Sequence, residues 1–251
     1  MLSEQQDRLI TVLVRARNPS NIGAVARAMH DLGFSHLRVV NDYPVPFAAA
    51  KSAVDASSVL ASATEPVTLA EALADCTLVL GTTAVGARAL EHPLHTLAEA
   101  STLIQSTLQQ DPSARVALLF GSEKTGLSNQ ELSHCHALLT IPMNTLTADR
   151  HLSMNLGQAA AVCLYSIAQT APQPVLETAT ETQATAGDLE RLTNLLQDVL
   201  FQSGYTRRHP ANARETIIRR LVRRMANTPD DATVWSGILR QILHALSRAG
   251  S

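Results

Sequence analysis

Short runs of apolar residues, each ending at a polar or glycine-containing turn, recur along the first part of the chain. They cover residues 10–14, 37–40, 77–81, 116–120 and 137–141. Because these runs show little alternation of polar and apolar residues, they are typical of strands buried on both faces of a parallel sheet. Segments with apolar residues at helical spacing lie between them, the first over residues 22–32. This order predicts an α/β fold with a doubly wound parallel sheet.

Caps and composition place the remaining boundaries. Further helices are expected over residues 48–60, 68–74, 97–109 and 128–134, from about residue 153, and over residues 188–203, 212–225 and 233–247. Two of them begin with a capping box, Thr68 with Glu71 and Ser128 with Glu131. Residues 170–186 contain no lysine or arginine and read as a linker. We therefore expect a domain over residues 1–169, a linker over 170–187 and a small all-α extension over 188–251.

Three strand ends carry the candidate chemistry, at residues 81–84, 121–126 and 141–155. The carboxyl ends of parallel strands meet at the edge of the sheet where open α/β folds bind ligands. Gly121 and Gly126 bracket a polar turn where backbone can approach a ligand closely. Their spacing is close to that of a phosphate-binding loop, but Leu127 stands where that loop needs lysine. The pattern favours a ligand held by backbone groups and apolar walls over a nucleoside triphosphate.

Composition excludes several other classes. The N-terminus lacks the basic start and apolar core of a signal peptide, and no apolar stretch is long enough to cross a membrane. The cysteines Cys76, Cys135 and Cys163 are scattered, which indicates reduced core thiols in a cytoplasmic protein. His134 and His136 flank Cys135, but adjacent side chains point in different directions and a second ligand cluster is missing, so we expect no metal.

Charge is segregated along the chain. Residues 201–251 hold nine arginines and three acidic residues, a net charge of +6, whereas residues 1–200 carry −8. A basic end on an acidic body indicates a polyanionic partner, but a solvated helical face has the same composition. Composition alone leaves both interpretations open.

Three stretches resemble sequence motifs of one enzyme family. They are residues 21–27 (NIGAVAR), 118–128 (LLFGSEKTGLS) and 152–159 (LSMNLGQA). In this order and spacing they resemble the SpoU branch, also called TrmH-type, of the SPOUT RNA 2′-O-methyltransferases. The resemblance implies a C-terminal trefoil knot in the sheet domain that binds S-adenosylmethionine, although pattern alone would not suggest a knot, because knots are almost absent from proteins. It also implies a homodimer.

The basic tail is similar to the helical extension of the TrmJ group of that family. The similar positions are residues 196–200, Gly204, His209-Pro210 and residues 218–221. This group methylates the ribose of nucleotide 32, a cytidine or uridine, in the anticodon loop of tRNA, so the resemblance implies tRNA as the partner. Alternatives from other classes are a methyltransferase acting on ribosomal RNA, a non-catalytic RNA-binding module of the same fold, and a dinucleotide or triphosphate enzyme. The last has the least support, because no G-x-G-x-x-G follows a strand.

Site residues follow from the resemblance position by position. The implied cofactor contacts are Thr82, Thr83, Ala84, Gly121, Ile141, Leu152, Ser153 and Met154. The implied catalytic residues are Arg27, Ser153 and Asn155. The expected RNA contacts are Asn21, Arg27, Glu123, Arg219, Arg220, Arg223 and Arg224. Two residues depart from the commonest motif wording, Ser122 where Arg or Pro is frequent and Met154 where Leu is usual.

Arg27 is the residue on which we expect methyl transfer to depend most. It lies off the apolar stripe of its helix, and a guanidinium can hold an RNA phosphate bidentately and so place the adjacent ribose. A guanidinium almost never loses its proton, so we expect positioning rather than general-base catalysis, with the proton leaving to phosphate, Ser153 or water. Asn155 and Ser153 stand at a helix start, where capping is the default role.

Overall fold

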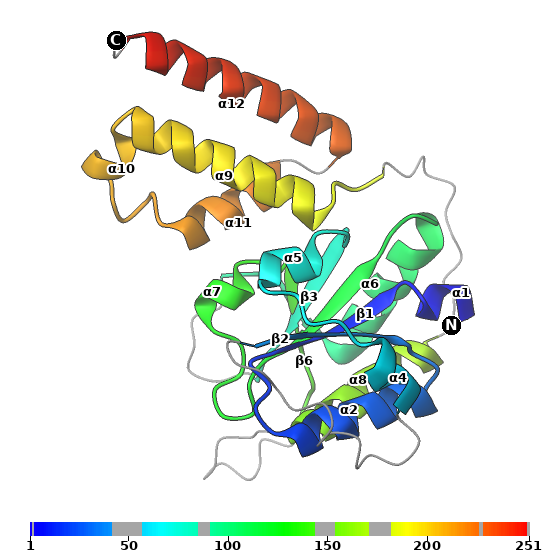
Figure 1. The fold of residues 1–251 in the computed structure, drawn as a ribbon. Coiled ribbons are helices and arrows are strands. Elements are labelled where there is room, and N and C mark those ends of the chain that lie inside the picture. The colour runs from blue at the N-terminus through cyan, green and yellow to red at the C-terminus, as the bar shows by residue number, and fades with distance from the viewer. Residues whose placement is uncertain are drawn as a thin grey trace.

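The structure is a computed structural model that describes residues 1, 3–41, 57–84, 91–143, 154–170, 182–225 and 228–249. Within these residues the core is a six-stranded sheet with the strand order β2-β1-β5-β3-β6-β4 (Figure 1). The strands are β1 (Leu9–Val14), β2 (His36–Val40), β3 (Leu78–Thr82), β4 (Leu94–Thr96), β5 (Val116–Phe120) and β6 (Ala137–Thr140). All five neighbouring pairs are parallel, so the predicted parallel sheet is confirmed.

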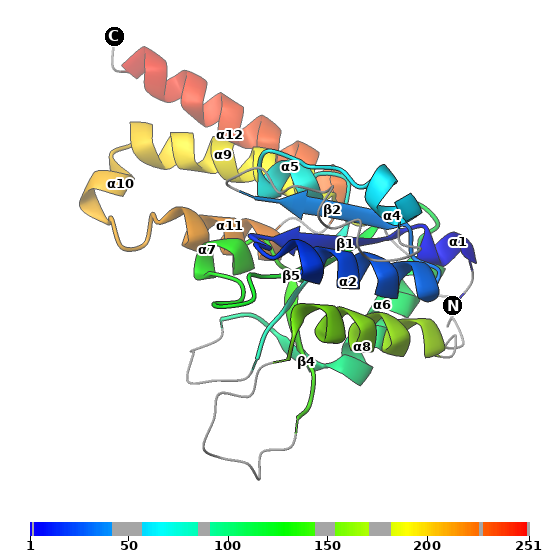
Figure 2. The same cartoon turned by 60° about the horizontal axis from the view of Figure 1, so that its bottom comes forward.

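Helices cover both faces of this sheet, as in a doubly wound fold. Those before the C-terminal extension are α1 (Ser3–Gln6), α2 (Pro19–Asp31), α4 (Ser57–Ser62), α5 (Leu69–Leu73), α6 (Leu97–Gln110), α7 (Asn129–Leu132) and α8 (Leu156–Gln169). Figure 2 shows α2, α6 and α8 on one face and α5 on the opposite face. The second face is covered by shorter helices than the first.

The burial of β1 explains why the strands read as continuous apolar runs. Leu9 and Leu13 pack into the core beneath α2, α6 and α8. Ile10, Val12 and Val14 point to the opposite side and pack with α5 and α7. Because both faces are buried, both sets of alternate positions are apolar except for Thr11, which is fully buried.

Several boundaries differ from those expected. The edge strand β4 has only three residues and lacks an apolar run, so its pattern is too weak to be recognised. Helix α8 begins at Leu156 rather than near Ser153, because Asn155 is its N-cap and accepts a hydrogen bond from the Gly157 amide at 2.9 Å. Of the helix expected over residues 48–60, the structure shows only α4, since residues 48–56 lie outside the described part.

The C-terminal helices form a core of their own. They are α9 (Ala186–Gln202), α10 (Tyr205–Arg208), α11 (Glu215–Met225) and α12 (Pro229–Ala249). Leu189, Leu192 and Val199 of α9 pack there with Ile218 and Val222 of α11. The long helices correspond to the three predicted ones, whereas the single turn α10 is too short to give a period. Among the described helices, none combines the length and apolarity needed to span a bilayer.

The end of the predicted linker is part of this packing. Thr185 caps α9, so the helix begins two residues before the expected start of the extension. The amide of Ala186 donates to the Cys76 carbonyl oxygen at 2.7 Å, and the amide of Gly187 donates to that of Ala74 at 3.0 Å. The beginning of α9 is therefore fixed to the turn between α5 and β3. Residues 171–181 of the predicted linker lie outside the described part.

Candidate active site

The carboxyl ends of the central strands bring several predicted cofactor residues to one edge of the sheet. The Thr82 hydroxyl at the end of β3 donates to the Leu119 carbonyl oxygen of β5 at 2.9 Å. The Thr83 amide donates to the Leu139 carbonyl oxygen of β6, also at 2.9 Å. Gly121 and Ile141 directly follow β5 and β6, and Ala84 follows Thr83. Met154 precedes α8, whereas Leu152 and Ser153 lie outside the described residues.

The loop after β5 folds back on itself. A Cβ atom on Gly121 would lie 2.2 Å from the carbonyl carbon of Gly126, so only glycine lets this loop close. Gly126 has a φ of +64°, which favours glycine. The close approach at Gly121 is therefore to its own loop, and the expected approach of a ligand to the backbone of this turn stays a prediction. Ser122 is buried and its hydroxyl lies 3.1 Å from that of Thr125, so this departure from the motif serves the loop.

Arg15, which the sequence analysis missed, holds this loop from the end of β1. Its Nε and one terminal nitrogen donate to the two carboxylate oxygens of Glu131 at 2.5 and 2.9 Å, and the same terminal nitrogen donates to the Gly126 carbonyl oxygen at 3.0 Å. Arg15 has a φ of 56°, which is uncommon for a residue with a side chain. Burial raises the pKa of Glu131, but hydrogen bonds from Arg15 and Ser128 outweigh it and hold that pKa below its usual value.

A hydrogen-bonded chain joins the three sequence motifs. The Asn21 side-chain amide of the first motif donates to the Glu123 carboxylate of the second at 3.0 Å. The Asn155 side-chain amide of the third donates to Asn21 Oδ1 at 3.1 Å. Glu123 also accepts from the backbone amides of Arg17 and Asn18, both at 3.3 Å. Partial burial raises the pKa of Glu123, but these hydrogen bonds outweigh burial and hold the pKa below its usual value. Glu123 is therefore ionised at neutral pH and suited to positioning the residues that donate to it.

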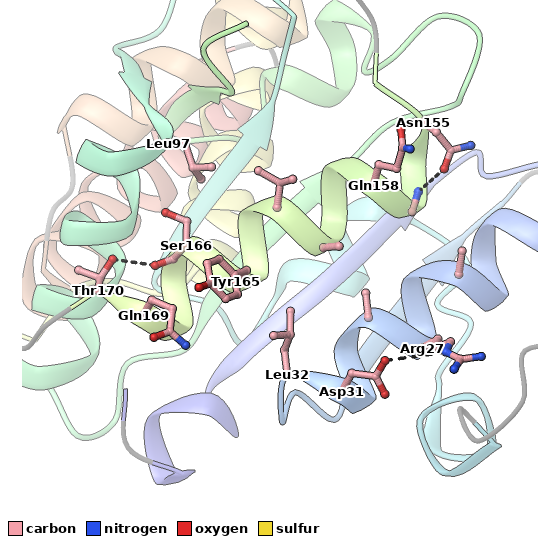
Figure 3. A pocket seen from close by; sticks show the side chains of 15 residues that line it. Arg27, Asp31, Leu32, Leu97, Asn155, Gln158, Tyr165, Ser166, Gln169 and Thr170 are labelled. Carbon is pink, nitrogen blue, oxygen red and sulfur yellow. Dashed lines mark hydrogen bonds and ion pairs between the residues drawn. The ribbon is translucent and has the colours of Figure 1, made fainter.

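Arg27 lies away from the strand ends, on the exposed side of α2. Its side chain is 55% exposed, and its Nε is 3.8 Å from a carboxylate oxygen of Asp31 (Figure 3). Among the described residues, no hydrogen bond or ion pair joins Arg27 to the loops at the strand ends. The guanidinium instead lines a groove that Asn155 and Gln158 also line. Of the described residues that follow the strand ends, Asn155 therefore shares this groove with Arg27.

This groove runs between α2 and α8 and has a volume of about 1010 Å³. The two helices approach so closely that a Cβ on Gly157 would lie 2.7 Å from that of Ala24. Val162 and Tyr165, which also line the groove, are 38% and 58% exposed. Exposed apolar side chains that line a groove are typical of an interaction surface. This surface was not predicted from the sequence, because Tyr165 and Val162 read as ordinary helix positions.

Two of the four tail arginines expected to bind RNA face the interior. Arg219 is 2% exposed and donates to both carboxylate oxygens of Glu190, at 2.9 and 2.8 Å. It also donates to the Ser133 hydroxyl at 3.1 Å and pairs with Glu215. Arg223 is 8% exposed. The structure therefore corrects the prediction that Arg219 and Arg223 contact RNA, since buried side chains cannot reach phosphate. Arg220 pairs with Glu91, and Arg224 is exposed.

The His134-Cys135-His136 sequence belongs to the same buried junction. His136 Nδ1 accepts a hydrogen bond from the Val79 amide at 3.0 Å, whereas His134 Nδ1 lies 4.0 Å from a Glu190 carboxylate oxygen. Burial lowers the pKa of both imidazoles to about 3. Burial also raises the pKa of the Cys135 thiol to about 12. All three cysteines are free and buried, as expected for core thiols.

The fold is a parallel sheet with helices on both faces. Hydrogen bonds join the three motifs, and the candidate cofactor loops gather at the strand ends. This arrangement fits the α/β class of enzymes that bind a ligand at the carboxyl edge of the sheet. The sequence model of the SpoU rRNA Methylase family matches residues 8–165, so the chain belongs to this family. The family predicted from the three motifs, and with it the expected class of enzyme, an RNA methyltransferase, is confirmed.

The relatives are more specific. The chain is 35% identical to the tRNA (cytidine/uridine-2′-O-)-methyltransferase TrmJ of Sodalis glossinidius, over 93% of this chain and 90% of the relative. It is 36% identical to TrmJ of Photorhabdus laumondii, over 92% and 95% of the two chains. The crystal structure of TrmJ from Z. mobilis ZM4 superposes with a TM-score of 0.78 at 29% identity, covering 93% of this chain and 98% of that one. The resemblance to the TrmJ group is thus confirmed, and it extends through the helical tail.

Proposed function

We propose that the protein transfers a methyl group from S-adenosylmethionine to a ribose 2′-hydroxyl of tRNA, at nucleotide 32 of the anticodon loop, where the base is cytosine or uracil. The observation that carries this proposal is the similarity to TrmJ relatives over 93% of the chain, helical tail included. A relationship confined to the sheet domain would support RNA methylation without indicating the substrate.

The strand-end loops fit the cofactor. Thr82, Thr83, Ala84, Gly121, Ile141, Leu152, Ser153 and Met154 are the residues that would hold it. S-adenosylmethionine supplies an electrophilic methyl group on a sulfonium. A carboxylate against that sulfonium would stabilise the ground state, because the positive charge disappears in the transition state. The two carboxylates described beside these loops are occupied instead, Glu131 by Arg15 and Glu123 by Asn21. The loops therefore offer backbone groups, hydroxyls and apolar side chains.

Arg27 serves the acceptor RNA in this proposal. Its exposed guanidinium holds a phosphate beside the target ribose, so that the 2′-hydroxyl lies in line with the methyl group. The proton leaves to phosphate, to Ser153 or to water, because a guanidinium does not accept it. Asn155 supports this arrangement indirectly, since it caps α8 and binds Asn21 of the helix that carries Arg27.

The α2–α8 groove supports a homodimer. Arg27 lines this groove, and among the described residues no hydrogen bond or ion pair connects it with the cofactor loops of its own chain. A second copy docked in the groove, against Tyr165 and Val162, would let each Arg27 serve the cofactor loops of its partner. The active site would then be complete only in the dimer. We further propose that the C-terminal part of the sheet domain forms the trefoil knot that the family resemblance implies.

The target nucleotide is tested with tRNA transcripts that lack one acceptor hydroxyl. We expect the protein to transfer labelled methyl groups from S-adenosylmethionine to unmodified tRNA, but not to tRNA carrying a 2′-deoxy substitution at nucleotide 32. The same substitution at nucleotide 33 is the matched control and should leave transfer intact. Incorporation into the 32-deoxy transcript would contradict the proposed position. Incorporation into ribosomal RNA alone would favour a methyltransferase that acts on ribosomal RNA. Incorporation into neither RNA would favour a non-catalytic RNA-binding module.

A further inference from the structure

The segment from Phe201 to Arg214 carries positive charge that no carboxylate of the described residues pairs with directly. It contains Arg207, Arg208 and Arg214 but no acidic residue. All three arginines are exposed. Arg214 Nε donates to the Ala211 carbonyl oxygen at 3.1 Å, and no ion pair among the described residues joins any of the three to a carboxylate. Three cations on one short segment repel each other unless an anion binds there.

The contrast with α11 makes this feature specific. There, Arg219 pairs with Glu190 and Glu215, and Arg220 pairs with Glu91. Arg219 and Arg220 thus hold the extension together and onto the sheet domain, whereas Arg207 and Arg208 are left for an external partner. Within the extension, some arginines therefore have a structural role in ion pairs, and others are exposed and available to bind an anion.

Aromatic side chains lie among the available arginines. Phe201, at the end of α9, is 75% exposed, and Tyr205, at the start of α10, is 36% exposed. The Tyr205 and His209 rings face each other with centroids 4.7 Å apart at an interplanar angle of 40°. Exposed aromatic rings among uncompensated arginines are the combination that proteins use for unpaired nucleotides, because bases stack on the rings while cations bind the phosphates.

The position of these residues connects them with the candidate active site. Figures 1 and 2 both show α10 on the same side of the molecule as α7, which directly follows the loop after β5. The hydrogen bond from Arg219 to the Ser133 hydroxyl fixes α11 at the end of α7. An RNA that reaches the strand ends can therefore continue toward α10 along one side of the protein.

We propose that Phe201, Tyr205, Arg207, Arg208, His209 and Arg214, here called the α10 patch, bind unpaired nucleotides of the substrate RNA. Arg207, Arg208 and Arg214 hold phosphates, and Phe201, the more exposed of the two aromatic side chains, stacks on a base. The inference rests on the proposed function in taking tRNA as the substrate, and it assigns to the α10 patch the contact that we had expected from the buried arginines of α11.

Matched charge removals test the electrostatic part. Arg207→Ala with Arg208→Ala should weaken binding of unmodified tRNA about tenfold or more near 0.1 M salt, measured by fluorescence anisotropy. The plot of log affinity against log salt should become less steep, its slope decreasing in magnitude by about 1.4 to 1.8, at roughly 0.7 to 0.9 for each of the two lost phosphate contacts. Arg240→Ala with Arg248→Ala removes the same charge from exposed positions on α12 and should leave that slope unchanged. Equal slopes for both double variants would overturn the proposal.

A second pair of variants tests stacking. Phe201→Ala should weaken tRNA binding about fivefold to a hundredfold while leaving the salt slope unchanged, and Phe201→Tyr should retain affinity. Val234→Ala removes a side chain of similar exposure, 61%, from α12 and should have no effect. No loss on Phe201→Ala would contradict the stacking role.

Methyl transfer by the wild-type protein separates this inference from the proposed function. If the wild-type protein methylates tRNA and the α10-patch variants bind tRNA normally, the proposed RNA-binding role of the patch alone is wrong. The variants would also bind tRNA normally if the patch served an acidic protein partner instead. A wild-type protein that binds tRNA through the patch without methylating it would overturn the proposed function alone.

Discussion

The imidazole of His136 illustrates how one buried polar residue makes stability depend on pH. Its Nδ1 accepts a hydrogen bond from the Val79 amide, so this nitrogen carries no proton in the folded protein. Burial, together with the nearby Arg223, lowers the pKa of His136 to about 3. In the unfolded chain the pKa of histidine is about 6.5. The unfolded state therefore binds a proton below about pH 6.5 that the folded state excludes.

We accordingly predict that the free energy of unfolding falls as the pH decreases from about 6.5 toward 3. The stabilisation from a neutral His136 is complete above about pH 6.5, and each pH unit below it removes at most about 1.4 kcal/mol for this ring. His136→Asn replaces the accepting nitrogen with an amide oxygen that does not titrate, so its stability should fall less steeply. Urea unfolding at several pH values measures both slopes. His244→Asn, at an exposed position of α12, should keep the wild-type slope; a wild-type slope in His136→Asn would contradict the explanation.

Arg15 is a single residue that stabilises the loop after β5 at the candidate cofactor site. Its guanidinium connects Glu131 to the Gly126 carbonyl oxygen, so Arg15→Ala should cost about 1.5–3 kcal/mol of stability, the range for hydrogen bonds to charged groups. It should also weaken S-adenosylmethionine binding, because the loop after β5 loses its clamp. Arg15→Gly loses the same clamp but relaxes the left-handed backbone. It should bind the cofactor as weakly as Arg15→Ala while being more stable by about 1 kcal/mol.

Calorimetry with S-adenosylmethionine and thermal unfolding distinguish these effects. Lys124→Ala removes an exposed cation from the same loop and should leave cofactor affinity unchanged. If Arg15→Ala bound the cofactor like the wild type, the loop would not need the clamp.

At the scale of elements, the sequence predicted what local patterns determine. Strands buried on both faces appeared as apolar runs, and the capping box of α7 marked a helix start. At α5 only half of the predicted capping box forms, because the Glu71 carboxylate accepts from the Val67 amide rather than from that of Thr68. The edge strand β4, with three residues, and the single turn α10 were missed because a period needs a longer segment. At the candidate site, the strand-end loops could be predicted because each directly follows an apolar run that marks a strand. The roles of Arg15 and Arg219 were missed because Glu131 and Glu190 become their neighbours only in the folded chain.

The junction between α9 and α5 gives a prediction at this scale. A Cβ on Gly187 would lie 2.7 Å from the Ala74 carbonyl oxygen, whereas one on Gly237 would meet no atom within 4 Å. Both glycines are helical, so intrinsic helix propensity alone favours alanine at both positions. We expect Gly187→Ala to destabilise the protein by about 1–3 kcal/mol through overpacking against backbone. Gly237→Ala should stabilise it by about 0.5–1 kcal/mol. Chemical denaturation measures both, and the same sign for the two would mean that α9 is free to move away from α5.

At the scale of the whole molecule, the two faces of the sheet differ in what covers them. The long helices α2, α6 and α8 cover one face, whereas the short α5 and α7 share the other with the beginning of α9. Ala186 belongs to this second core, and Arg219 joins α11 to the end of α7. The C-terminal extension is therefore an additional layer on the side of α5 and α7, and its removal would uncover apolar side chains of the sheet domain. The opposite face carries the α2–α8 groove, which remains available for a second copy.

The proposed dimer leads to a test of which chain supplies Arg27. Arg27→Ala should reduce methyl transfer at least about tenfold, roughly 1.4 kcal/mol in the barrier, with cofactor affinity intact. Ile141→Lys places a positive charge at a predicted cofactor contact and should abolish binding of the cationic sulfonium, which calorimetry would establish for a folded variant. A mixed dimer of the two variants, purified through two different tags, then distinguishes the geometries. If Arg27 serves the partner, the Arg27→Ala chain keeps intact cofactor loops and receives Arg27 from the Ile141→Lys chain. One site of two is complete, and the rate should be about half that of the wild type. If Arg27 serves its own chain, neither site is complete, and the mixed dimer should be as inactive as each variant alone.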